Sequence, residues 1–302
     1  MAENVVITGM ARTPMGGMQG VLSEVAAPNL GADSIRASLE RAGASPERVD
    51  ETIMGCVLPA GLGQAPARQA SLNAGIPDTT GCVTINKMCG SGMKAVMMGH
   101  DAIAAGSSDL IVAGGMESMT NAPYILPKMR GGLRLGHGEV LDHMFVDGLE
   151  DAYEKGRLMG TYAEDTSKHY GFTREAQDEF AIESLKRAQR AIDKGEFKRE
   201  IVPVKIATRK GETEIDTDEQ PGNARLDKIP QLKPAFAKDG TVTAANSSSI
   251  SDGAAAMILA SEDYAKGEYV GAGNFQPETL KILMTSPRIG DEQQQRHQSK
   301  NG

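Results

Sequence analysis

Cys89 lies in the stretch INKMCGSGMKAV, residues 85–96, where glycines and short polar residues surround a single thiol. The stretch follows a run rich in β-branched residues and opens a run of small residues and methionines that predicts a helix. A thiol at such a turn lies near the unpaired N–H groups of the helix, which favour the nucleophilic thiolate. Gly90 and Gly92 would let a substrate carbonyl approach the backbone closely. Cys89 is therefore a candidate nucleophile.

The cysteine pattern leaves a structural interpretation open beside this one. A free cysteine commonly packs as a small buried hydrophobe. The chain has three cysteines, Cys56, Cys82 and Cys89, which have no metal-ligand spacing and cannot all pair with one another. Reduced thiols of a reducing compartment fit this number and arrangement. Cys56 lies inside a predicted strand and Cys82 at the start of another, so we expect both to be structural.

Composition and charge exclude several classes of function. The chain has 302 residues, 40% of them hydrophobic, and a formal net charge of −8. Nucleic-acid affinity comes mainly from basic side chains, so we expect no nucleic-acid partner. The first residues do not form a signal peptide, and no run of about 18 apolar residues occurs, which predicts a cytoplasmic protein without a membrane partner. Positive charge between Lys128 and Lys233 fits either a phosphorylated ligand or a solvated surface.

The elements that must position Cys89 alternate along the first part of the chain. Apolar runs predict strands at 4–9, 51–57, 82–86 and 109–114, and helical periodicity predicts helices at 29–42, 66–74 and 90–105. A further apolar strand is expected at 254–260. This alternation is typical of an α/β protein with helices layered on a sheet.

The middle of the chain differs in composition and periodicity. Residues 116–157 are rich in glycine, proline, methionine and histidine, which predicts an ordered loop region. Thr173 is a good N-cap for a helix that runs to about residue 194. We expect strands at 200–207 and 213–216. The apolar residues of the helix predict its buried face; they are Ala176, Phe180, Ile182, Leu185, Ala188 and Ile192.

Five segments together resemble the thiolase family. They are NKMCGSG at 86–92, VAGGMESM at 112–119, RGGLRLGHGE at 130–139, DGLEDAYEKGRLMG at 147–160 and GTVTAANSSSISDGAAA at 240–256. The resemblance extends in order from Met1 to about Lys266, and in detail it is to the biosynthetic acetyl-CoA acetyltransferases. A ketoacyl synthase on the related fold is a weaker interpretation, because the runs around Cys89 and Glu117 look like thiolase.

The resemblance implies an acyltransferase that works on CoA thioesters and needs no cofactor or metal. Cys89 would take an acetyl group from acetyl-CoA, and the enolate of a second acetyl-CoA would attack it to give acetoacetyl-CoA and CoA. By the same resemblance Leu149 and Met159 would line the pantetheine arm of CoA, and Ser248 would hydrogen-bond it. Ordinary packing and a loop cap are the alternatives for these three. Residues 220–227 depart from the family pattern, so the resemblance assigns no adenine-side contact there, although Arg225 is near.

The resemblance also implies a fold of two similar βαβαβαββ halves. Residues 1–118 with 246–266 would form the N-terminal half, and 119–245 would be an inserted loop domain that binds CoA. Residues 267–302 form a polar tail that does not resemble the family, and we expect it to be disordered. The second half is not recognised in this sequence. The family suggests a homo-oligomer, a dimer of dimers.

Three runs of the family are not found in these 302 residues: Asn-Glu-Ala, Gly-His-Pro, and a second cysteine followed by glycines. In the family that histidine activates the nucleophile, and that cysteine moves the α-proton. A positioned base contributes about 10²–10⁴ in rate, so we expect condensation to be impaired or lost. The alternative is a catalytically dead subunit that binds acyl-CoA or interacts with a thiolase.

Overall fold

The computed structural model describes residues 4–208 and 211–269. Six strands form one mixed sheet in the order β1-β10-β5-β3-β4, with β2 paired to β10. Strand β3 is parallel to β4 and β5, whereas β10 is antiparallel to β1 and β5. The strands are β1 (Val5–Arg12), β2 (Gly16–Gly17), β3 (Glu51–Gly55), β4 (Gly81–Ile85), β5 (Leu110–Ser118) and β10 (Ser251–Ser261).

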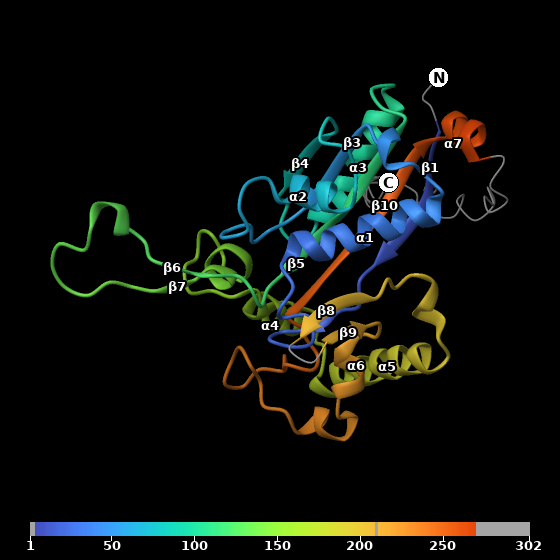
Figure 1. Ribbon diagram of the computed structural model, residues 1–302. Coiled ribbons are helices and arrows are strands. Elements are labelled where there is room, and N and C mark those ends of the chain that lie inside the picture. Colours follow the sequence, from blue (N-terminus) through green and yellow to red (C-terminus); the bar gives the residue numbers. More distant parts are fainter. Residues whose placement is uncertain (1–3, 209–210, 270–302) are drawn as a thin grey trace, which may run out of the picture.

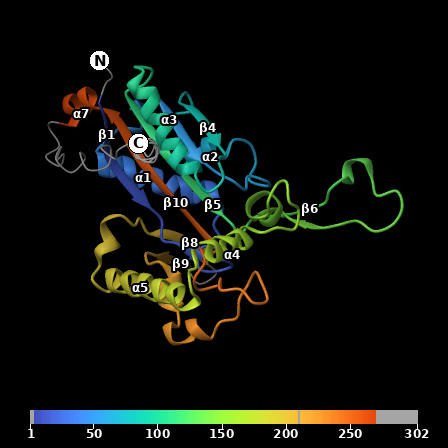
Figure 2. The same ribbon diagram turned by 180° about the vertical axis from the view of Figure 1, so that it is seen from behind.

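Helices cover both faces of this sheet. Helices α1 (Ala27–Ala42) and α2 (Pro66–Asn73) pack on one face, nearer the viewer in Figure 1, and α3 (Ser91–Ala104) packs on the other, as Figure 2 shows. Neighbouring residues of one strand pack into the cores on opposite faces of the sheet: Ile258 of β10 packs with α1, and Leu259 packs with α3. This alternation follows from the period of two along a strand. The prediction of an α/β layered fold is confirmed.

The amino-acid sequence explains the buried face and both ends of α1. Leu30, Ile35 and Leu39 lie on one face of the helix and are buried in the core beneath it. Pro28 sits in the first turn, where its missing N–H costs no helical hydrogen bond. Gly43 ends the helix in the left-handed conformation, with φ +64°, and its N–H donates to the Glu40 carbonyl.

The predicted elements of the sheet unit lie at most a few residues from the observed ones. Strand β5 continues to Ser118, four residues past its predicted end at 114, and β10 starts at Ser251, three before its predicted start. Both extensions carry chemistry-bearing side chains, Glu117 and Asp252, to the end of the sheet where Cys89 lies.

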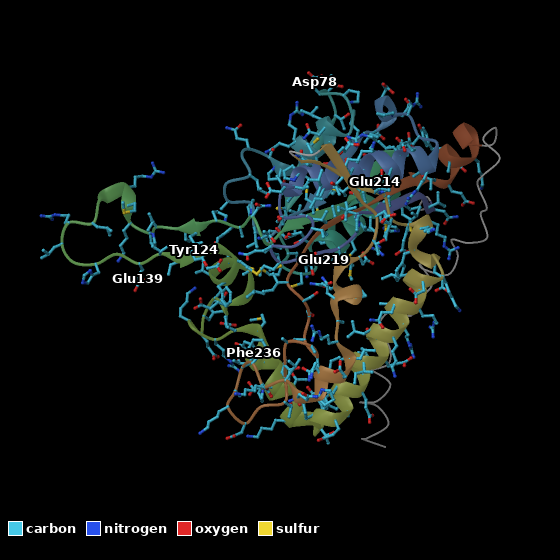
Figure 3. All side chains as sticks on the ribbon, turned by 60° about the horizontal axis from the view of Figure 1, so that its bottom comes forward. Asp78, Tyr124, Glu139, Glu214, Glu219 and Phe236 are labelled. Carbon is cyan, nitrogen blue, oxygen red and sulfur yellow. The ribbon has the colours of Figure 1, made fainter. Side chains whose placement is uncertain are left out.

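The segment between β5 and β10 holds smaller elements. A pair of two-residue strands, β6 (Tyr124–Ile125) and β7 (Leu141–Asp142), closes the arm 126–140, which projects away from the sheet in Figure 1. Figure 3 labels Tyr124 at the base of the arm and Glu139 on it. Next along the chain come α4 (Met159–Tyr170), α5 (Arg174–Asp193), the hairpin β8 (Val204–Thr208) and β9 (Gly211–Ile215), and α6 (Glu219–Asn223).

The short helical turns complete the list of elements. There are 3₁₀ turns at Pro46–Arg48, Met129–Gly131, Glu196–Arg199 and Leu226–Gln231, and a π-helical turn at Phe145–Leu149. Helix α7 (Glu262–Tyr269) follows β10 and includes the first residues of the tail predicted at 267–302; residues 270–302 lie outside the described residues. None of the described helices is long and apolar enough to cross a membrane. The domain boundaries at 118/119 and 245/246 stay a prediction.

The predicted buried face of α5 is wrong at Ala176 and Phe180, which are exposed, Phe180 by 80%. The other four predicted residues are half-buried: Ile182, Leu185, Ala188 and Ile192. The fully buried residues of the helix are Asp178, Ala181 and Ala191. The reason is that the face is partly polar: Asp178 accepts a hydrogen bond from Arg174 of the same helix at 2.7 Å and one from Asn246 at 3.0 Å. The N-cap prediction is confirmed, because the Thr173 hydroxyl accepts from the Ala176 N–H at 3.2 Å.

Ion pairs join the segment between β5 and β10 to the end of β1. The Arg12 guanidinium donates two hydrogen bonds to Asp218, at 2.7 and 2.9 Å, and one to Glu200 at 2.8 Å. Glu219, labelled in Figure 3, accepts from the backbone N–H groups of Gly17 and Val21 at 2.8 and 3.0 Å. Bidentate arginine–carboxylate contacts fix the relative orientation of the two side chains as well as their distance. The residues just before α6 are therefore tied to the edge of the sheet.

We predict that Gly9→Ala destabilises the protein by about 1–3 kcal/mol, because overpacking forces the surrounding atoms to move. A Cβ at Gly9 would lie 2.4 Å from the Ser38 carbonyl oxygen and 2.8 Å from the Ala42 Cβ, so strand β1 would be pushed off α1. Urea unfolding followed by circular dichroism measures the change.

Gly81→Ala is the matched control, because a Cβ there meets no atom of the described residues within 4 Å. Its stability should lie within about 0.5 kcal/mol of the parent chain. Equal effects of the two substitutions would show that the close packing of β1 on α1 does not limit stability.

Candidate active site

Cys89 lies in the turn that joins β4 to α3, between Ile85 and Ser91. Its side chain is exposed, in contrast to that of Cys56. The preceding residue, Met88, has φ +50°, which costs a residue other than glycine roughly 1–2 kcal/mol. Strain of this kind persists only where the surroundings impose it, and it gathers at functional sites. The turn therefore holds Met88, the residue before Cys89, in a conformation that its side chain does not favour.

Short polar side chains build this turn. The Asn86 side-chain oxygen accepts from the Met88 N–H at 2.9 Å, as asparagine commonly does two residues on. The Ser91 hydroxyl accepts from the Lys87 N–H at 2.8 Å and donates to the Met88 carbonyl at 2.6 Å. Asparagine and serine in the sequence around Cys89 are thus explained by the backbone groups that they satisfy.

Glycines let the first turn of α3 lie directly on the sheet. A Cβ at Gly55, the last residue of β3, would lie 2.6 Å from the Ser91 Cβ and 2.8 Å from the Gly92 nitrogen. A Cβ at Gly115 of β5 would lie 3.4 Å from the Gly92 Cα. The close approach brings the positive end of α3, with its N–H groups that lack helical acceptors, to the carboxyl ends of β3 and β5.

A cavity of about 360 Å³ opens beside Cys89. It lies at the carboxyl ends of the parallel strands, where α/β sheets commonly bind ligands. Its walls come from β1, β3, β5, β10 and the Cys89 turn; its lining residues include Arg12, Met15, Val57, Met88, Cys89, Gly92, Glu117, Ser251 and Asp252. The candidate nucleophile thus lines an open cavity.

Glu117 is a cavity residue that the sequence analysis missed. Its carboxylate accepts hydrogen bonds from the Val57 N–H at 2.8 Å and the Leu58 N–H at 3.0 Å, and the Cys56 thiol donates at 3.6 Å. Burial raises the pKa of Glu117, an effect opposed by these hydrogen bonds and by the charge of His143. A carboxyl group near the end of a buried strand, two residues after a pair of glycines, was the available signal.

The other two cysteines lie as the sequence predicts. Cys56 is buried, and this burial, with the nearby charge of Glu117, raises the pKa of its thiol to about 12. Cys82 is half-buried, and its thiol donates to the Thr80 carbonyl at 3.5 Å. Neither lines the cavity beside Cys89. The interpretation of Cys56 as structural agrees with its burial.

The structure does not bring the three predicted CoA-binding residues to the lining of this cavity. Leu149 ends the π-helical turn, Met159 begins α4, and Ser248 lies exposed just before β10. An isolated bridge pairs Glu150 with Leu158, which places Leu149 and Met159 one residue further along on the two sides of that bridge. Two of the three residues are therefore neighbours, and the roles of all three stay predictions.

His143 is buried. Its Nδ1 lies 2.7 Å from an Asp147 carboxylate oxygen, and its Nε2 is buried and has no hydrogen-bond partner among the described residues. No histidine lines the cavity within the described part of the chain. No group of three or more His, Cys, Asp or Glu side chains among the described residues could hold a metal ion.

Comparisons with known proteins agree with this geometry. The family model "Thiolase, N-terminal domain" matches residues 5–263. An acetyl-CoA acetyltransferase of Cupriavidus necator is 52% identical over 265 residues, which are 87% of this chain and 67% of that protein. One of Pseudomonas aeruginosa is 49% identical over 266 residues, again 87% and 67%.

A solved structure leads to the same group of proteins. The acetyl-CoA acetyltransferase of Syntrophomonas wolfei superposes with a TM-score of 0.85 at 40% sequence identity, over 88% of this chain and 67% of that one. This chain thus spans about two thirds of the length of the relatives that it matches.

We predict that limiting iodoacetamide at about pH 8 alkylates Cys89 before Cys82 and leaves Cys56 unmodified, because alkylation needs an accessible thiolate. With a pKa of about 12, only about one Cys56 thiol in ten thousand is ionised at about pH 8. Peptide mapping by mass spectrometry identifies the modified residue, and Cys89→Ser is the control. Rapid labelling of Cys56 in the folded protein would contradict its placement.

Proposed function

This chain belongs to the thiolase family of acyltransferases, and from that premise we propose that Cys89 takes an acetyl group from acetyl-CoA and passes it to a second acetyl-CoA, forming acetoacetyl-CoA and CoA. The observation that carries the proposal is the exposed thiol of Cys89 on a cavity at the first turn of α3. The proposed reaction uses CoA thioesters and no cofactor.

In the first step the Cys89 sulfur attacks the carbonyl carbon of acetyl-CoA. A carbon–sulfur bond forms to Cys89 while the carbonyl electrons move to oxygen, and the intermediate then expels the thiolate of CoA. One thioester replaces another, so the step needs no external energy source. N–H groups at the start of a helix stabilise a developing oxyanion, and α3 begins two residues after Cys89.

In the second step the α-carbon of another acetyl-CoA attacks acetyl-Cys89. A base removes the α-proton, the new carbon–carbon bond forms, and the Cys89 thiolate leaves. The runs that the resemblance assigns to these proton transfers are not found in the 302 residues. The condensation is therefore tested separately from the acetyl transfer.

Leu149 and Met159 are proposed to contact the pantetheine arm, with Ser248 as a hydrogen-bonding partner. The support is their position beside the Glu150–Leu158 bridge and the 45% exposure of Met159, which leaves apolar surface for a flexible chain. A cytoplasmic location and assembly into a homo-oligomer belong to the same proposal. The alternative function, an acyl-CoA-binding subunit without turnover, remains the second candidate.

We predict that incubation with acetyl-CoA adds one acetyl group to Cys89, because the exposed thiol lies on the cavity. Intact mass followed by peptide mapping detects the adduct, and Cys89→Ser should lose it while Cys82→Ser keeps it. Absence of an adduct on folded protein would refute acetyl transfer by this chain.

The same preparation decides between the two candidate functions. Formation of acetyl-CoA from acetoacetyl-CoA and CoA would support the complete reaction. An adduct on Cys89 without this turnover would limit the chain to the first step, and acyl-CoA binding with neither result would favour the binding subunit.

We predict that Leu149→Ser with Met159→Ser raises the acetyl-CoA concentration for half-maximal acetylation of Cys89 by about tenfold, because it removes apolar contacts with the arm of CoA. Leu126→Ser, on the projecting arm, is the matched control, because Leu126 is an exposed apolar residue like Met159. The dependence of the acetylation rate on acetyl-CoA concentration gives both values. An unchanged half-saturation would remove both residues from the substrate site.

A further inference from the structure

We propose that Glu117 is a positioning residue for Cys89 and acts through Val57 and Asn86 along a continuous chain of hydrogen bonds. Its role in catalysis rests on the proposed function, whereas its effect on the Cys89 turn does not. These hydrogen bonds lead from β5 to the loop after β3 and from there to the turn before α3.

The first link joins Glu117 to the loop after β3. One carboxylate oxygen accepts from the Val57 N–H at 2.8 Å, and the other accepts from the Leu58 N–H at 3.0 Å. The Cys56 thiol, 3.6 Å away, adds a third donor. Both oxygens of Glu117 are thus used to hold three consecutive residues, which fixes the path of the chain as it leaves the sheet.

The second link joins this loop to the turn that carries Cys89. The Asn86 side-chain amide donates to the Val57 carbonyl in a long hydrogen bond of 3.4 Å. The Cys56 N–H donates to the Ile85 carbonyl at 3.0 Å, beside the first contact. The loop that Glu117 holds is therefore bonded to the two residues that precede the turn.

The third link reaches the residue next to Cys89. The Asn86 side-chain oxygen accepts from the Met88 N–H at 2.9 Å. Met88 is the residue with φ +50°, so this contact lies where the backbone is strained. Ser91 holds the same residue from the side of α3, by donating to its carbonyl. Met88 is thus held on both sides, and Cys89 follows it directly.

A carboxylate suits the start of this chain better than an amide. An ionised carboxylate has two acceptor oxygens, whereas a glutamine side chain has one acceptor oxygen and an NH₂ group that donates. With Glu117→Gln, the N–H of Val57 or Leu58 would face a donor. The loop should then shift, and the shift should pass through Asn86 to the turn.

The test measures the rate of Cys89 alkylation by iodoacetamide, a reaction that needs no acetyl-CoA. Glu117→Gln and Asn86→Ala should each lower this rate by about tenfold, since each breaks one link of the chain. Because both substitutions break the same series of hydrogen bonds, Cys89 alkylation in the double variant should be slower than in either single variant by less than about threefold. The Cys82 alkylation rate, read in the same sample, reports loosening of the whole fold and should not change.

The matched control is Glu139→Gln, which neutralises an exposed carboxylate on the projecting arm (Figure 3) and should leave the Cys89 rate unchanged. With acetyl-CoA, Glu117→Gln should lower the maximal rate of Cys89 acetylation and keep the half-saturating concentration. Such a division is expected when the nucleophile moves and the binding of CoA stays intact.

Two results would overturn the inference. One is a Cys89 alkylation rate in Glu117→Gln within about twofold of the parent, with Cys82 unchanged. The other concerns the double variant: its Cys89 alkylation rate would fall by the product of the two factors found for the single variants. Glu117 and Asn86 would then act independently. If the parent chain shows no acetylation at all, the proposed function fails, and the alkylation rates still decide the role of Glu117.

Discussion

The contact between the first turn of α3 and the ends of β3 and β5 is the constraint on which the site depends. Gly55, Gly92 and Gly115 meet there, and a side chain on Gly55 would overlap the backbone of α3. Because the helix can approach so closely, its N–H groups reach the end of the sheet, and the turn before it must be short. Cys89 occupies that turn. The position of the thiol therefore depends on the absence of a side chain at Gly55.

Around this contact the protein uses polar groups to fix backbone that regular structure does not hold. Glu117 holds the loop after β3, and Glu219 holds the turns after β1. Arg12 ties Asp218 to the same end of the sheet. Buried or half-buried carboxylates that accept from backbone N–H groups recur in these places, since loops at the mouth of a cavity must be fixed without strands or helices. The apolar cores stabilise the layers, and these carboxylates shape the rim.

Much of the fold could be predicted from the sequence, because the sheet unit obeys local rules. Periodicity placed α1, α2 and α3, and Gly43 marked the end of α1 where the structure has it. Cys89 was found for the same reason, since its neighbours specify a turn and a helix start. Helix α4 was missed because its sequence, MGTYAEDTSKHY, has no clear apolar stripe. Phe180 was misplaced because the inward face of α5 carries the Arg174–Asp178 ion pair, which no hydrophobic pattern reveals. Glu117 was missed because its partners lie about 60 residues away in the chain.

The projecting arm has a consequence for how the protein responds to proteases. Every residue from 126 to 140 is exposed, and Lys128, Arg130 and Arg134 lie among them. Exposed loop segments are the usual sites of proteolytic cleavage, because the backbone must leave its fold to enter a protease. Among the described residues, trypsin should therefore cut this arm first, while β5 and β10 stay paired along nine residue pairs. A nicked protein would still hold its two pieces together through the central sheet, with Cys89 and its turn in the N-terminal piece.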